Sequence, residues 1–415
     1  MKNTNTYLDK LLEGVVVEWK TLGEVAEIIR GVRVTKRDLL DGGKYPVVSG
    51  GTGYMGYVNE YNREENTITI AQYGTAGYVK WQTQKFWAND VAFAIYPINE
   101  NQLSKKYLYY FLVFKQEYLY AISNRTAVPY SISKDSILKL QIPIPPLSVQ
   151  KEIVRILDTF TELTAELTAE LTARKKQYAF YREQLLTFPM ENGEWKMEND
   201  SQLSTFNFQL KKVEWKTLGD ESIGKFIRGG ELQKKDFTEK GVGCIHYGQI
   251  YTYYGTYTDK TKTFVSEEFA KKARMAKQGD LVIATTSEND EDLCKAVAWL
   301  GKDDIAISSD ACFYRHNMNP KYVAYFFQTE HFQKQKRTFI TGTKVRRVNA
   351  DDLAKIKIPI PSLAEQERIV SILDKFDTLT TSISEGLPKE IELRKKQYEY
   401  YRNLLLNFDK FKMEI

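Results

Sequence analysis

The chain has 415 residues, of which 42% are hydrophobic and 27% charged, so it is long and apolar enough to bury more than one core. Lysine and arginine exceed the acidic residues by only 59 to 54, a surplus too small to indicate nucleic-acid binding unless the basic residues cluster. No run of eighteen apolar residues occurs and the chain begins without an apolar signal segment, so we expect a soluble, cytoplasmic protein.

The first region in chain order, residues 1–146, alternates short β-rich runs such as NTITIAQYG with glycine turns and a few amphipathic segments. This mixture predicts an α+β module. Within it, Gly51–Gly56 reads GTGYMG, which matches the GxGxxG pattern of dinucleotide and S-adenosylmethionine sites. The residues that follow are polar and contain no amphipathic helix that could present its N-terminus to a phosphate, so we expect a turn.

A long helix is predicted over residues 147–188, after the extended segment IPIPP. Its apolar residues recur at spacings of three and four, as in a coiled-coil seam. These seam residues are Phe160, Leu163, Leu167, Leu171 and Tyr178. The helix contains ELTAELTAELTA, Glu162–Ala173, in which each tetrapeptide supplies one leucine to the seam. We expect this repeat to set the length of the helix; the alternative is a product of replication slippage in a solvated helix.

A second module follows a short connection. Residues 189–212 are polar and irregular, and we expect a linker there. Residues 213–361 again contain short β-rich runs, such as DLVIATT and DIAISSDACFY, and predict a second α+β module. Both modules begin with VEWKTLG, at Val17–Gly23 and at Val213–Gly219, yet their middles share little sequence. The two modules therefore share repeated ends but differ in the sequence between them.

A second long helix is predicted over residues 362–415, beginning at a capping box of Ser362 and Glu365. Gly386 and Pro388 are expected to kink it. Its seam residues are Phe376, Leu379, Ile383, Leu387, Ile391 and Tyr398.

The two helices carry the same motifs. IPIPPLSVQKEIVRILD at Ile142–Asp158 matches IPIPSLAEQERIVSILD at Ile358–Asp374, and RKKQY begins at both Arg174 and Arg394. We expect an α+β fold in which two globular α/β modules are separated by two long antiparallel coiled-coil helices, related by a pseudo-twofold internal repeat. Duplex DNA with two half-sites is a partner of matching symmetry.

Together, the VEWKTLG start, the IPIPP-LxxQ-x-x-IV-x-ILD and RKKQY-x-x-YR-x-x-LL helix motifs and the TAEL-like tetrapeptides resemble the specificity subunit of type I restriction-modification enzymes. The resemblance implies a non-catalytic subunit that reads a bipartite double-stranded DNA target with two target recognition domains. It implies that the helices act as a spacer and bind methyltransferase (modification) subunits, and that restriction subunits join afterwards. S-adenosylmethionine, ATP and magnesium would then belong to the partner subunits, with no cofactor in this chain.

Motifs that would make the chain an enzyme are missing. There is no GxxxxGK[ST] loop for ATP, and no NPPY or DPPY tetrapeptide, which the resemblance places in the methyltransferase partner. His246, His316 and His331 are scattered and the three cysteines lack CxxC spacing, so we expect neither a metal site nor a disulfide. The alternatives are a self-sufficient DNA modification enzyme or nuclease, and a coiled-coil structural protein that does not bind DNA.

Candidate DNA contacts lie in basic segments that recur in the two copies. Ile28–Arg37 has its counterpart in Ile227–Lys235, and the most basic segment, His331–Asn349, has its counterpart in Tyr118–Lys134. Arginine can fork onto guanine, whereas lysine mostly meets phosphates; for any single residue the alternative is an ordinary solvated face. The candidates are Arg30, Arg33, Lys36, Arg37, Tyr73, Arg125, Tyr130, Arg228, Lys234, Lys235, Arg337, Lys344, Arg346 and Arg347, and the segment His331–Asn349 also holds Lys334 and Lys336.

Overall fold

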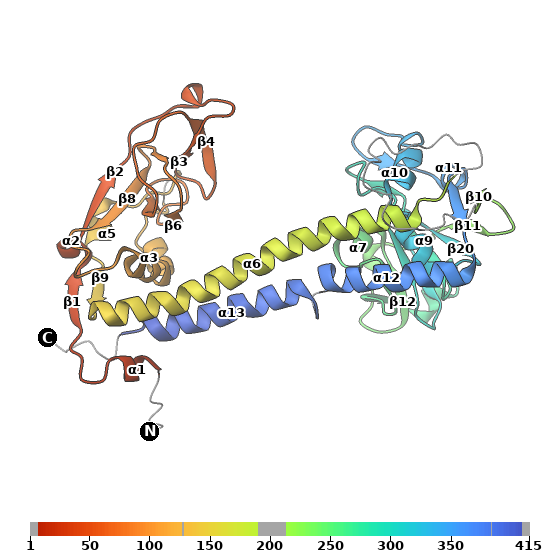
Figure 1. Cartoon of the computed structure of the whole chain (residues 1–415). Coiled ribbons are helices and arrows are strands. Elements are labelled where there is room, and N and C mark those ends of the chain that lie inside the picture. The colour runs from red at the N-terminus through yellow and green to blue at the C-terminus, as the bar shows by residue number, and fades with distance from the viewer. Residues whose placement is uncertain (1–6, 127, 190–212, 383, 409–415) are drawn as a thin grey trace. The chain divides into compact units, whose positions relative to one another are not determined.

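A computed structural model of the chain describes residues 7–126, 128–189, 213–382 and 384–408 (Figure 1). The chain divides into two compact units, each with one module and one pair of helical segments. Unit 1 comprises Met1–Leu167 and Ile391–Ile415, and unit 2 comprises Thr168–Glu390. Residues 190–212 of the expected linker, and the seam residue Ile383, lie outside the described residues.

Each module begins and ends in a two-stranded antiparallel ribbon. In unit 1 the ribbon pairs β1 (Glu18–Thr21) with β9 (Gln141–Ile144). In unit 2 it pairs β10 (Glu214–Thr217) with β22 (Lys357–Ile360), in the same register. The repeated VEWKT and IPI sequences thus form a stem that brings the two ends of each module together.

The first module is built on an antiparallel sheet of order β2-β8-β5-β6, with a smaller sheet of order β4-β3-β7. The main-sheet strands are β2 (Ala26–Arg30), β8 (Ala92–Pro97), β5 (Thr67–Ala71) and β6 (Val79–Gln82), and the smaller sheet holds β4 (Tyr54–Val58), β3 (Tyr45–Val48) and β7 (Trp87–Ala88). Helix α3 (Lys105–Phe114) covers the main sheet, because Tyr107, Leu108 and Phe111 share one buried cluster with Ile68 and Ile70 of β5. The short helices are α1 (Tyr7–Leu11), α2 (Leu22–Val25), η1 (Lys36–Asp38), α4 (Gln116–Ala121) and α5 (Lys134–Leu138).

The second module repeats this plan with additions. Its main sheet has the order β11-β20-β16-β18-β13, in which only the edge pair β13–β18 is parallel, and its second sheet has the order β14-β12-β19-β15. The main strands are β11 (Gly224–Arg228), β20 (Ala311–His316), β16 (Leu281–Ala284), β18 (Ala296–Trp299) and β13 (Tyr257–Thr258). The other strands are β14 (Thr263–Val265), β12 (Val242–Ile245), β19 (Ile305–Ile307), β15 (Met275–Ala276), β17 (Thr286–Ser287) and β21 (Arg346–Arg347). The helices are η3 (Lys234–Asp236), α7 (Tyr247–Thr252), α8 (Glu267–Ala270), α9 (Pro320–Phe326), α10 (Glu330–Arg337) and α11 (Ala350–Leu353). The shared order β2-β8-β5-β6 and β11-β20-β16-β18 confirms the α+β internal repeat.

Helix α6 (Leu147–Leu186) is continuous over 40 residues and passes through the tetrapeptide repeat without a break. Its threonine hydroxyls, such as those of Thr164 and Thr172, donate to carbonyls one turn earlier, which keeps them compatible with the helix. In unit 1, Phe160 of α6 stacks on Tyr401 with ring centres 5.1 Å apart. In unit 2, Tyr178 stacks on Phe376 at 6.2 Å. Each half of α6 therefore packs against a helix of its own unit through seam aromatics.

The second long helix is not one helix. It consists of α12 (Leu363–Thr381), which Ser362 caps by accepting from the Glu365 amide, and α13 (Leu387–Leu406). Between them Gly386 has φ +86°, and a side chain there would overlap the carbonyl oxygen of Thr378. Gly386 directly precedes α13, and its carbonyl oxygen accepts from the Glu390 amide at 3.1 Å. A positive φ is not helical, so one helix cannot run through this position, and the expected single kinked helix over residues 362–415 was wrong here.

The seam residues differ in burial. Leu167, Tyr178, Leu387 and Ile391 are buried, and Phe160, Leu163, Leu171, Phe376, Leu379 and Tyr398 are half-buried. Of the tetrapeptide leucines, Leu167 is therefore buried and Leu163 and Leu171 are half-buried, and the glutamates and threonines between them keep the rest of the helix surface polar.

A buried glutamine joins each module to its helix. Gln150 of α6 accepts from the Ser104 amide at 2.8 Å and donates to the carbonyl oxygen of Pro145 at 2.8 Å. Gln366 of α12 does the same, accepting from the Asn319 amide at 2.8 Å and donating to Pro361 O at 2.9 Å. The glutamine of the repeated LxxQ motif thus satisfies backbone groups at the start of the module helix.

The aspartate of the repeated ILD motif makes a second joint. Asp374 accepts from the hydroxyl of Tyr325 and from the ammonium of Lys321, both at 2.7 Å. In unit 1, Asp158 accepts from the Tyr110 hydroxyl and lies 3.2 Å from the Lys106 ammonium. The module helices therefore carry a matching K-Y-x-x-Y motif, Lys106–Tyr110 and Lys321–Tyr325.

We expect Gln366→Ala to lower the free energy of unfolding of unit 2 by about 2–6 kcal/mol, because two buried backbone groups each lose a partner at about 1–3 kcal/mol. Chemical denaturation followed by circular dichroism measures this loss. The matched control is Glu367→Ala, which changes the neighbouring exposed residue of the same helix and should stay within about 0.5 kcal/mol of the parent. Equal losses in the two variants would show that the Gln366 hydrogen bonds do not stabilise the joint.

Candidate nucleic-acid interface

The last basic segment forms a closed loop in the second module. Thr341 and Arg347 exchange two backbone hydrogen bonds of 2.9 Å, and β21 pairs with β17 so that Arg347 lies opposite Thr286. Gly342 closes the turn with φ +87°, where a side chain would overlap the carbonyl oxygen of Val345. We call residues 341–347 the second basic loop.

The first module has a loop that is closed in the same way at the corresponding place. Asn124 and Ser131 exchange two backbone hydrogen bonds of 2.7 and 3.1 Å, and Ser131 forms a β-bridge with Tyr73. The residue after each loop, Ile132 or Val348, donates to the strand end that follows β5 or β16. We call residues 124–131 the first basic loop. The structure thus places the two segments that the sequence paired at equivalent positions.

The arginines of the second basic loop are paired with carboxylates. Arg346 Nε lies 3.0 Å from Asp290 Oδ1, and Arg347 Nη2 lies 3.6 Å from Asp310 Oδ1. Arg347 and Lys344 are exposed, and the side chain of Arg346 keeps 34% of its surface. In α10, Arg337 pairs with Glu330 at 2.8 Å. All four candidates of this segment therefore reach solvent.

Lys336 is a correction to the expected basic surface. Its side chain is fully buried, and its ammonium donates to the carbonyl oxygens of Asp290 at 2.6 Å and Leu293 at 2.9 Å. Burial lowers the pKa of this ammonium. The charge pattern alone could not separate Lys336 from the exposed Lys334.

In the first basic loop, the Arg125 guanidinium lies over two tyrosine rings, 5.1 Å from the centre of Tyr120 and 5.4 Å from that of Tyr130. Its Nε also donates to the Tyr120 carbonyl oxygen at 3.1 Å. Arg125 and Tyr130 are exposed, and Tyr73 is half-buried beside them. The first module therefore holds one loop arginine between aromatic rings, where the second module uses a carboxylate.

The N-terminal basic segments also occupy equivalent positions. Arg30 ends β2 and Arg228 ends β11, both exposed, and a side chain at the following glycine would overlap the carbonyl oxygen of Asn89 or Ser308. This close approach explains the repeated IRG. The exposed residues Arg33, Lys36 and Arg37 follow in unit 1, and Lys234 and Lys235 follow in unit 2.

The two basic segments of each module meet at the turn before β8 or β20. In unit 1, Arg30 Nε donates to Asp90 O at 2.6 Å, and the neighbouring Val91 O accepts from the Gln72 amide beside Tyr73. In unit 2, Asp310 pairs with Arg347 while its carbonyl oxygen accepts from the amide of Thr285. The segment after Arg228 reaches the same turn, because the Gly229 amide donates to Ala311 O at 2.9 Å. In each module the two basic segments therefore share the surface around this turn.

Sequence reasoning missed two arginines on this surface. Arg63 Nη2 donates to the carbonyl oxygen of Arg30, and Arg274 Nη1 donates to that of Arg228, both at 3.0 Å. The pairs are equivalent in the two modules, yet Arg63 and Arg274 lie in the unlike middles. No motif marks them in the sequence.

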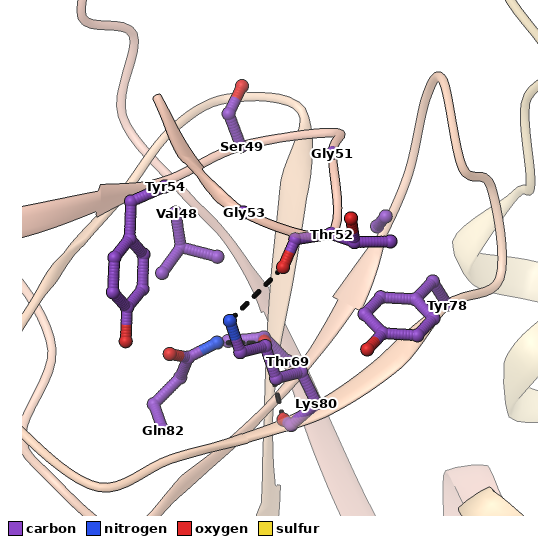
Figure 2. A pocket seen from close by; sticks show the side chains of 11 residues that line it. Val48, Ser49, Gly51, Thr52, Gly53, Tyr54, Thr69, Tyr78, Lys80 and Gln82 are labelled. Atoms are coloured by element: carbon purple, nitrogen blue, oxygen red, sulfur yellow. Dashed lines mark hydrogen bonds between the residues drawn. The ribbon is translucent and has the colours of Figure 1, made fainter. Parts of the chain in front are cut away.

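The glycine motif GTGYMG is a turn followed by a strand. Residues 51–53 form a bend and β4 begins at Tyr54, so no helix N-terminus faces the glycines, as expected. The turn borders a small hollow that Thr69 and Gln82 also line (Figure 2). Lys80 spans it, donating to Thr52 O at 3.1 Å with its ammonium 4.6 Å from the centre of the Tyr54 ring. Gly50 O accepts from the Thr75 amide at 2.9 Å, which joins this hollow to the turn after Tyr73.

The histidines hold local structure. His316 Nδ1 accepts from the Met318 amide, and burial lowers the pKa of its imidazole to about 4. His246 caps α7 by accepting from Gly248, and His331 packs on Trp215 with ring centres 4.7 Å apart. Within the described ranges, no three His, Cys, Asp or Glu residues are grouped to hold a metal. Of the helices that the structure describes, none has the length and apolar character to cross a membrane.

Comparison with known proteins decides the family. The family model described as type I restriction modification DNA specificity domain matches residues 16–174 and 211–393. The chain belongs to the type I DNA specificity family. It is 36% identical over 426 residues to a type I restriction enzyme specificity subunit of Escherichia coli, with 98% of each chain covered. The crystal structure of a type I restriction-modification S subunit from M. genitalium shares its fold, with a TM-score of 0.60 at 18% identity over 97% of this chain and 98% of that one.

The helices of this specificity chain expose one aromatic residue in each copy. Phe180 and Tyr400 both follow six residues after the arginine of RKKQY, and 56% and 64% of their surfaces are exposed. The motif's own arginines are turned along the helix, since Arg174 donates to Gln177 at 2.9 Å and Arg394 donates to Gln397 at 3.1 Å. The two exposed aromatic residues thus occupy equivalent positions in the two copies of the helix motif.

Proposed function

We propose that this specificity chain is the non-catalytic, sequence-reading subunit of a type I restriction-modification complex and acts in the cytoplasm. The first module, residues 1–146, contacts one half of a bipartite duplex DNA target, and the second module, residues 213–361, contacts the other. Residues 147–188 and 362–415 set the distance between half-sites and bind methyltransferase subunits, to which restriction subunits are added. S-adenosylmethionine, ATP and magnesium belong to those partners.

One observation carries the proposal: the same closed loop stands at the same strand end in both modules but presents different side chains. The first basic loop offers Arg125 and Tyr130, and the second offers Lys344, Arg346 and Arg347. Loops on a rigid sheet are suited to recognition because they can vary while the scaffold stays fixed. Equal scaffolds with unlike loops fit a target whose two halves differ in sequence.

The remaining basic residues fit contacts with the DNA backbone. Exposed lysines and arginines that do not contact DNA bases position a protein on duplex DNA by neutralising phosphates. In the first module these are Arg30, Arg33, Lys36 and Arg37, and in the second they are Arg228, Lys234, Lys235 and Arg337. We add Arg63, Arg274 and Lys80 to this set, since the first two adjoin Arg30 and Arg228 and the third borders the hollow of Figure 2.

Phe180 and Tyr400 support the proposed docking of methyltransferase subunits on the helices. Aromatic residues are enriched at protein interfaces, and these two recur at equivalent positions of the two copies. Two equivalent positions suit two identical partner subunits. Binding of the RKKQY lysines to DNA phosphates is the alternative use of this helix face.

We expect replacement of Arg346 and Arg347 by alanine to weaken DNA binding by about 1–3 kcal/mol for each arginine that reads a base, and to relax discrimination in one half-site only. Arg125→Ala should relax the other half-site. The measurement is binding of the chain assembled with methyltransferase subunits to duplex DNA over a range of salt concentrations, together with mapping of methylated sites.

The matched control is Arg155→Ala, which removes an exposed arginine from α6, outside both loops. It should leave the methylated sequence unchanged. If the Arg346–Arg347 variant binds and methylates as the parent does at every salt concentration, the second basic loop is not part of the interface.

A further inference from the structure

The second basic loop has an acidic neighbour. Residues 288–292, which read ENDED, follow β17 and form an acidic loop that is closed by its own hydrogen bonds. Asn289 accepts from the Asp292 amide at 2.8 Å and donates to the Asp292 carboxylate at 2.9 Å. Carboxylates next to a surface that binds phosphates lower the affinity for DNA. Their presence beside the second basic loop therefore indicates a role other than phosphate binding.

Buried Lys336 fixes this acidic loop from below. Its ammonium donates to Asp290 O at 2.6 Å and to Leu293 O at 2.9 Å, and the side chain has no exposed surface. A buried ammonium is costly unless its donors are satisfied, so the two carbonyls are held firmly around it. The backbone of Asp290 is thereby fixed relative to α10, which leads into the second basic loop.

The Asp290 carboxylate reaches one arginine of that loop. Oδ1 of Asp290 is shielded from solvent and lies 3.0 Å from Arg346 Nε, without the alignment of a hydrogen bond. Arg346 Nη1 donates to Gly342 O at 2.8 Å. This oxygen is buried and therefore cannot accept from a base. Its use is to hold the guanidinium.

The two contacts engage Nε and Nη1 of the guanidinium and leave Nη2 for a ligand. Among the described residues, no partner is found for Nη2 of Arg346, and one N–H of Nη1 also stays available. A guanidinium with both N–H groups of Nη2 and one N–H of Nη1 free can donate to O6 and N7 of guanine in the major groove. A fixed fork loses less conformational freedom on binding than a mobile one, and it rejects a base pair that does not offer two acceptors.

We propose that Asp290 is a positioning residue that presents Arg346 to a guanine in the half-site of the second module. The inference rests on the proposed function, since it requires the second basic loop to face DNA. It adds the base class that this loop reads and the residue that makes the reading selective. Among the described residues, Arg125 of the first module has no carboxylate partner and lies over two tyrosine rings, so the two modules fix their arginines by different means.

The test compares Asp290→Ala, Asp290→Asn and Arg346→Ala in the complex with methyltransferase subunits, using a library of duplexes randomised over both half-sites. We expect all three variants to lose discrimination at the same guanine–cytosine pair, by on the order of ten- to a hundredfold, with the other half-site unchanged. Asp290→Asn keeps the shape of the side chain and removes its charge. If Asp290→Ala does not assemble, the base preference of Asp290→Asn tests the inference in its place. Binding of Asp290→Ala to nonspecific DNA should be equal to or tighter than that of the parent, because a negative charge is lost.

The matched control is Glu288→Ala, which removes an exposed carboxylate from the same acidic loop. It should leave the base preference intact. If Asp290→Ala tightens binding to all DNA and keeps the parent's preference, Asp290 only repels phosphate and the inference is wrong. If its loss of preference falls at a different base pair from that of Arg346→Ala, Asp290 reads a base itself, and the inference is again wrong. If Arg346→Ala also keeps the parent's preference, the proposed function of the loop fails as well.

Discussion

A chain that lacks Glu166–Ala169 is expected to assemble and to methylate the same two half-sites with a gap about one base pair shorter. Helix α6 is continuous through this stretch, so removing four residues shortens it by about 6 Å, which lies between one and two base-pair steps of about 3.4 Å. The leucines on either side, Leu163 and Leu171, keep a spacing of four, so the apolar stripe stays on one face.

Mapping of methylated sites by sequencing measures the gap directly. The control is a deletion of Glu166 and Leu167 alone, which turns the rest of α6 by about 200° and moves the stripe away from its partner helix. That variant should lose methylation. A stable and active complex of the four-residue deletion that keeps the parent's gap would show that the repeat does not measure DNA and would favour the slippage alternative.

Replacing the second module by a copy of the first should produce a chain that reads the same half-site sequence twice. The exchange puts residues 17–142 in place of residues 213–358. It is feasible because the ribbons β1–β9 and β10–β22 have the same register, and both modules carry the K-Y-x-x-Y motif that binds the ILD aspartate. The methylated target should lose the half-site of the second module and contain the half-site of the first module twice. This change in the target is larger than any single substitution should cause.

The measurement is again the methylated sequence of cells that express the exchanged chain with its methyltransferase subunits. As a control, the exchanged chain with Arg125→Ala in only one of the two copies should relax only one half. Methylation at a target that retains the native second half-site would refute the assignment of that half-site to the second module. Change in both halves at once would refute independent reading by the modules.

The parts of the fold that could be predicted from the sequence are those in which repeated residues make equivalent contacts in both modules. The VEWKT and IPI segments pair with each other, and Gln150 and Gln366 bind equivalent backbone groups, so repetition marked them. The sequence predicted a kink before α13, whereas the structure has a break. A glycine in a helical pattern does not reveal whether its φ is positive.

The candidate site was harder to predict because it depends on contacts between distant segments. Lys336 lies in a basic run, yet it is buried against carbonyls of residues more than 40 positions earlier. Asp290 meets Arg346 only after β17 pairs with β21. Composition and spacing describe neighbours along the chain, and these contacts are neighbours only in the folded module.

The boundary between the two compact units falls between Leu167 and Thr168, inside ELTAELTAELTA. The repeat therefore lies where α6 leaves one unit and enters the other, and its neighbouring glutamates and threonines belong to neither buried core. Because each tetrapeptide is encoded by a whole number of codons, gain or loss of a copy during replication keeps the reading frame and both folded modules. If the repeat sets the gap, as the first prediction expects, such a change gives a lineage a new methylated sequence in a single heritable step.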